Sequence, residues 1–132
     1  MTRDWSSSGI DWRDESQDEL MAADWLAASG QRDFPSADVY YRVQELLMTD
    51  LDPPRGWRLL QGLVRLASND DQLWQIGSDA IPHMIRDHEE LIGAELAHLM
   101  RTDSKWRQTY KGQMDVAFYE FMRKEHLADL SD

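Results

Sequence analysis

Histidine and carboxylate side chains at helical spacing are the first candidates for chemistry in this chain. His83 and Asp87 stand four residues apart, and His88 follows directly. On one helix, two ligands at this spacing could share a metal ion. Glu95 and His98 have the Glu-x-x-His spacing of di-iron carboxylate bundles, but those bundles need a second such pair, which the sequence lacks. We therefore expect no metal site and no cofactor, and we interpret these residues as the polar faces of helices.

Two acidic pairs, Asp70-Asp71 and Glu89-Glu90, could in principle perform acid–base chemistry. Each pair lies at a predicted helix start, where the helix dipole favours acidic residues. The chain has no cysteine, which excludes disulfides, thiolate zinc sites and a cysteine nucleophile. It also lacks the Gly-x-Ser-x-Gly elbow, the phosphate loop and the dinucleotide fingerprint. We therefore expect a protein that is not an enzyme, with no catalytic residue.

Charge is the strongest compositional signal, with 14 basic against 25 acidic residues and a net charge of -11. Residues 1–40 alone carry nine acidic and three basic residues. Such a polyanion repels nucleic acid and anionic membrane surfaces, so its natural partner is a basic protein surface. The alternative, which stays open, is that the charge only keeps the protein soluble.

Three of the six tryptophans lie among the acids of this N-terminal segment. Aromatic rings supply anchoring area at interfaces, and neighbouring acids steer a basic partner. We therefore predict an acidic protein-binding module, such as an inhibitor or immunity-type protein of bacterial or phage origin. It would dock on the basic surface of a nucleic-acid-handling protein. The alternative is that these rings cover the open end of the bundle. The predicted partner-contact residues are Asp11, Trp12, Asp14, Glu15, Asp18, Glu19 and Trp25.

The elements that position these residues are all predicted to be helices, which makes the fold class all-α, a compact bundle of about six or seven helices. A helix from Ser16 ends at Gly30. A later one is opened by Pro54 after Asp52. The predicted apolar face of the first is Leu20, Ala23, Leu26 and Ala27, and that of the second is Leu60, Leu63, Val64 and Ala67. Trp57, Trp74 and Trp106 fit the core.

Asn69 is expected to cap a further helix, which Gly77-Ser78-Asp79 should break. Pro82 would then lie in a new first turn, and Asp87 would start another helix. We expect residues 1–14 to form a flexible acidic tail and residues 15–128 to form a single helical domain. The apolar runs are too short to cross a bilayer, which favours a cytoplasmic protein.

A 36-residue offset relates Leu60, Leu63 and Val64 to Leu96, Leu99 and Met100. A period of this length is typical of stacked helical hairpins, although any two amphipathic helices share leucine spacing. This pattern supports the alternative function, a structural or assembly domain that acts through self-association, for example as a homodimer.

Three segments carry a family resemblance: Asp52-Pro53-Pro54-x-x-Trp57, Ile76-Gly77-x-Asp79-x-Ile81-x-x-Met84-Ile85, and Lys105-Trp106-Arg107. With them the chain resembles a family of small bacterial helical domains of unknown function. In that family a Gly-rich turn precedes a short Leu-Glu-Asp-Leu-Leu-like helix. Here Pro82 and His83 replace the acidic pair. The resemblance implies the helical fold and no activity.

Overall fold

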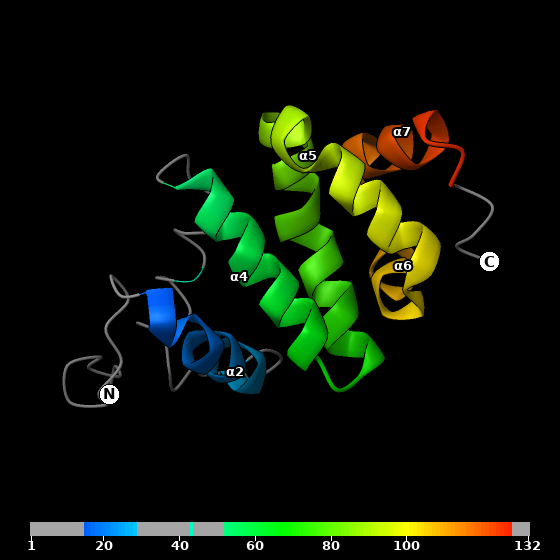
Figure 1. Cartoon of the computed structure of the whole chain (residues 1–132). Helices are drawn as coiled ribbons and strands as arrows, with labels where there is room; N and C mark the ends of the chain where they lie inside the picture. Colours follow the sequence, from blue (N-terminus) through cyan, green and yellow to red (C-terminus); the bar gives the residue numbers. More distant parts are fainter. Residues whose placement is uncertain (1–14, 29–42, 44–51, 128–132) are drawn as a thin grey trace. The chain divides into compact units, whose positions relative to one another are not determined.

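The computed structural model describes residues 15–28, 43 and 52–127, and everything regular in that part of the chain is helical. It contains five α-helices and one 3-10 turn, so the all-α prediction is confirmed and the helix count there is lower than the expected six or seven. The elements are η1 Glu15–Gln17, α2 Asp18–Ala28, α4 Pro53–Leu66, α5 Asp70–Thr102, α6 Ser104–Tyr110 and α7 Val116–Lys124 (Figure 1).

The chain divides into two compact units, Met1–Ala67 and Ser68–Asp132. The predicted single domain, residues 15–128, spans both of them. The predicted tail, residues 1–14, lies outside the described residues. Within the part of the chain that the structure describes, no helix is both long enough and apolar enough to cross a membrane.

In the first unit, α2 packs against α4. Asp52 caps α4 by accepting a hydrogen bond from the Arg55 backbone N–H at 3.2 Å. Pro54 lies in the first turn of α4, as predicted, and Pro53 lies there too. The predicted apolar face of α4 is confirmed, because Leu60, Leu63, Val64 and Ala67 are all buried.

Of the four residues predicted for the apolar face of α2, Leu26 is buried as predicted and the other three are exposed, so the predicted register is wrong. Leu20 is exposed, as are Ala23 and Ala27, whereas Met21, Ala22, Trp25 and Leu26 are buried. Apolar residues occur all around α2, so periodicity alone could not choose the buried side. The bulky Met21 and Trp25 side chains bury more apolar area than alanines would, and this favours the observed rotation.

In the second unit, α5 runs without a break through Gly77, Ser78 and Asp79, so the predicted helix end there is wrong. Pro82 consequently lies inside α5 and not in a first turn. The other predicted boundary is nearly right, because the backbone leaves helical geometry at His88, with φ -138° and ψ 28°. Helices α6 and α7 both pack against α5, and their aromatic residues Trp106, Phe118 and Phe121 are buried.

Candidate functional site

Among the described residues of the first unit, the most buried ion pair joins α2 to α4. The Arg55 guanidinium donates to both carboxylate oxygens of Asp18, from Nη2 to Oδ1 at 2.7 Å and from Nε to Oδ2 at 3.3 Å. Only 9% of the Arg55 side chain and 15% of the Asp18 side chain are exposed. The hydrogen bond that Arg55 donates to Asp18 raises the pKa of Arg55 further above its already high value. A bidentate ion pair of this kind restricts the geometry with which the two helices meet.

Two exposed ion pairs join α4 to η1 and to α2. Arg58 donates to Glu15, and Arg65 lies 3.8 Å from Glu19. Three of the predicted partner-contact acids therefore face arginines of α4. Their prediction as a docking surface remains a prediction, but each now has an internal partner that a docking protein would have to displace.

The remaining predicted contact residues divide in two. Asp11, Trp12 and Asp14 lie outside the described residues. Trp25 is only 3% exposed, so its ring belongs to the core of the first unit. The opposite holds for Trp74, which was expected in the core and is 49% exposed. The apolar pattern did not predict this exposure. Trp74 lies between Leu73 and Ile76 in the sequence, but only those two neighbours are buried.

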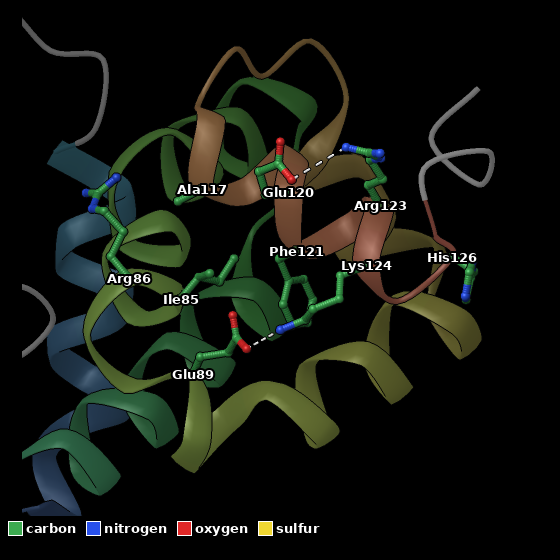
Figure 2. A pocket seen from close by; sticks show the side chains of 9 residues that line it. All are labelled: Ile85, Arg86, Glu89, Ala117, Glu120, Phe121, Arg123, Lys124 and His126. Carbon is green, nitrogen blue, oxygen red and sulfur yellow. Dashed lines mark hydrogen bonds and ion pairs between the residues drawn. The ribbon is translucent and has the colours of Figure 1, made fainter.

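A groove of about 570 Å³ lies between the middle of α5 and α7 in the second unit (Figure 2). Its apolar floor includes Ile85 and Phe121, and charged side chains stand around its rim. The full lining is Ile85, Arg86, Glu89, Ala117, Glu120, Phe121, Arg123, Lys124 and His126. Sequence reasoning missed this groove because Glu89 was interpreted only as a first-turn acid. No local signal shows that it meets a lysine 35 positions later.

Each basic side chain on the rim, apart from His126, has a carboxylate beside it. Lys124 donates to Glu89, Arg123 lies 3.8 Å from Glu120, and Arg86 donates to Asp115 at 3.0 Å. An incoming anion would therefore have to compete with these carboxylates.

Lys124 is held in its charged form. The hydrogen bond to Glu89 is the main cause that raises the pKa of Lys124, and the nearby negative charge adds to it. Its ammonium group also lies 5.9 Å from the centre of the Phe121 ring, within range of a cation–π contact. A lysine that acts as a nucleophile or base needs a lowered pKa, so this groove is not arranged for lysine chemistry.

His126 lines the groove with an unusual backbone, at φ 58°. It ends α7 in a Schellman motif, in which the His126 N–H donates to Arg123 O at 3.0 Å and the Leu127 N–H donates to Met122 O at 2.7 Å. Leu127 is buried, as the hydrophobic contact of this motif requires. The position of His126 is thus explained by helix termination.

The histidines of α5 are arranged around its kink. His83 Nε2 lies 3.4 Å from Asp87 Oδ2, and the rings of His83 and His88 have centroids 6.2 Å apart. Glu95 and His98 are exposed on the second half of the helix. Among the described residues, no group of three or more His, Cys, Asp or Glu side chains is arranged to hold a metal ion.

No protein-family model, curated protein or solved structure matches this chain. The resemblance to small bacterial helical domains therefore remains a hypothesis, and the functional argument depends on this chain's own charges and surfaces.

Proposed function

We propose that this chain is an acidic protein-binding module that docks on a basic surface of another protein in the cytoplasm. The observation that carries the proposal is a surplus of exposed carboxylates after internal pairing. The helices use their arginines and lysines in ion pairs such as Arg55–Asp18 and Lys124–Glu89. Asp70, Asp71 and Asp79 on α5 are exposed, and no ion pair to another described residue neutralises them.

The first half of α5 carries acids but no lysine or arginine. The stretch 68–85 contains three acidic residues and not one lysine or arginine. Its negative charge is thus available to a partner without breaking an internal ion pair, unlike that of Glu15, Asp18 and Glu19. A basic surface that normally contacts phosphates would be attracted by carboxylates in the same way. This supports the more specific proposal of an inhibitor or immunity-type protein of a nucleic-acid-handling protein.

Co-purification tests the proposal. The tagged chain is expected to retain a basic protein in near-stoichiometric amount from the cells in which it occurs. The triple variant Asp70→Asn, Asp71→Asn, Asp79→Asn should lose most of that protein. The control variant Glu90→Gln, Glu95→Gln, Glu120→Gln has the same net charge and should retain it. Equal retention by both variants would show that Asp70, Asp71 and Asp79 do not contact the partner, and failure to retain any basic protein would refute the proposal.

A second proposal is self-association, in which the chain forms a bundle of stacked helical hairpins and assembles as a homodimer. It is favoured by exposed apolar side chains on and before α7, since Met114 is 95% and Val116 is 72% exposed. Light scattering over a range of concentrations distinguishes the two proposals. A strict monomer would count against assembly and leave the docking proposal in place.

A further inference from the structure

The exposed Trp74 ring lies beside the connection between α6 and α7. A Cβ atom built on Gly112 would lie 3.8 Å from the indole Nε1. Gln113 fastens this connection to α5 and α6, because its side-chain N–H₂ donates to Trp74 O at 2.9 Å and to Thr109 O at 3.0 Å. Trp74 and the connection are therefore held together as one part of the second unit.

Exposed apolar side chains are frequent in the sequence around this connection. Six large apolar side chains are exposed within the described residues. Four of them belong to Trp74 and to the short segment that follows Gln113, and we name these four the Trp74 patch: Trp74, Met114, Val116 and Tyr119. Apolar side chains concentrated in this way mark an interaction surface more often than single exposed ones do.

Acidic residues flank the tryptophan on its own helix. Asp70 and Asp71 precede Trp74 by four and three positions, so they lie on the same side of α5. The connection 111–115 carries one base, Lys111, and one acid, Asp115, so it does not offset the two aspartates of α5. An indole face bordered by carboxylates is suited to a guanidinium or ammonium group, which the ring quadrupole and the acids both attract.

We propose that the Trp74 patch is the surface on which a basic protein segment docks, with an arginine over the Trp74 ring and apolar neighbours against Met114, Val116 and Tyr119. The inference rests on the proposed function and adds to it the place of contact and the anchor residue. The acids argue against two other occupants. A second copy would bring the same carboxylates to the contact, and nucleic acid would be repelled by them.

Binding of a defined peptide to the isotope-labelled full chain tests the proposal. The probe is a synthetic peptide of alternating arginine and leucine, and its counterpart has glutamate in place of arginine. In NMR titrations we expect the arginine peptide to shift the Trp74 indole N–H and the amides of Gly112 and Gln113. Trp74→Ala should weaken binding about tenfold, as loss of a central aromatic anchor typically does. Leu91→Ala removes a side chain of similar exposure, 51%, and should leave affinity unchanged.

Several results would overturn the inference, and some of them would not affect the proposed function. Binding that Trp74→Ala does not weaken, or shifts centred on residues 15–19, would refute the Trp74 patch while leaving a basic partner in place. Equal binding of the glutamate peptide would remove the charge argument. Self-association that Trp74→Ala abolishes would make a second copy the occupant. No binding at all would refute the patch, and the co-purification experiment then decides the proposed function independently.

Discussion

Gly77 of α5 lies directly against the backbone of Thr109 in α6. A Cβ atom on Gly77 would stand 1.9 Å from the carbonyl oxygen and 2.8 Å from the carbonyl carbon of Thr109. Real atoms do not approach so closely, so only glycine lets the two helices meet here. The residue that looked like a helix breaker is instead a contact point within a continuous helix.

Gly77→Ala should therefore destabilise the second unit by about 3 kcal/mol, because the new methyl group must push rigid backbone aside. Urea unfolding followed by circular dichroism measures the change. Gly62→Ala is the control, since among the described residues its added Cβ would meet only the flexible end of Arg65, at 3.7 Å. There we expect a gain of about 0.5 kcal/mol from better helix propensity. Similar effects of the two variants would contradict the close contact.

The Arg55–Asp18 pair should matter more for stability than its exposed neighbours. Asp18→Ala leaves a mostly buried guanidinium without its carboxylate, and we expect a loss of about 2 kcal/mol. Adding Arg55→Met should recover part of that loss, because no charge then remains buried. Glu15→Gln, at the exposed pair with Arg58, should change stability little. A double-mutant cycle from urea unfolding curves gives the coupling, and a cycle that shows none would contradict the pair.

Helix type and capping were the features that the sequence predicted best. The Asn69 cap is confirmed, because its side chain accepts from the Gln72 N–H at 2.9 Å. These features depend on residues a few positions apart, so local patterns contain the necessary information. The prediction of a helix end at Gly77 was wrong for the opposite reason. Its cause is Thr109, 32 positions later, and glycine serves helix ends and close helix contacts equally well.

The candidate surfaces show the same limit. Lopsided charge drew attention to acidic residues, but Asp18 is matched by Arg55 across 37 positions, which no local pattern reveals. From their neighbours in sequence, Trp25 was predicted to be a contact residue and Trp74 a core residue. The structure buries Trp25 and exposes Trp74. Burial depends on how a helix is rotated against its partner, and a helix such as α2, apolar on most sides, does not specify that rotation.

Alkaline pH should weaken the second unit through Tyr110. Burial is the main cause that raises the pKa of this phenol above its usual value, and the nearby Tyr119 adds to the effect. Because the folded-state pKa lies above the unfolded one, the neutral phenol stabilises the fold below about pH 10, and that stability is lost as the pH rises further. Tyr110→Phe cannot ionise, so its unfolding free energy should fall less between neutral pH and this range. An equal fall in both proteins would rule out the tyrosine as the cause.

His126 offers a direct test of backbone strain at the end of α7. Its φ of 58° is a conformation that costs a side chain about 1 kcal/mol and costs glycine almost nothing. His126→Gly should therefore raise the unfolding free energy by about 1 kcal/mol, whereas His126→Ala removes the imidazole but keeps the Cβ and should bring no gain. Thermal and urea unfolding of the three proteins measure the difference. If alanine stabilised the protein as much as glycine does, the imidazole and not the backbone would be the source of the strain.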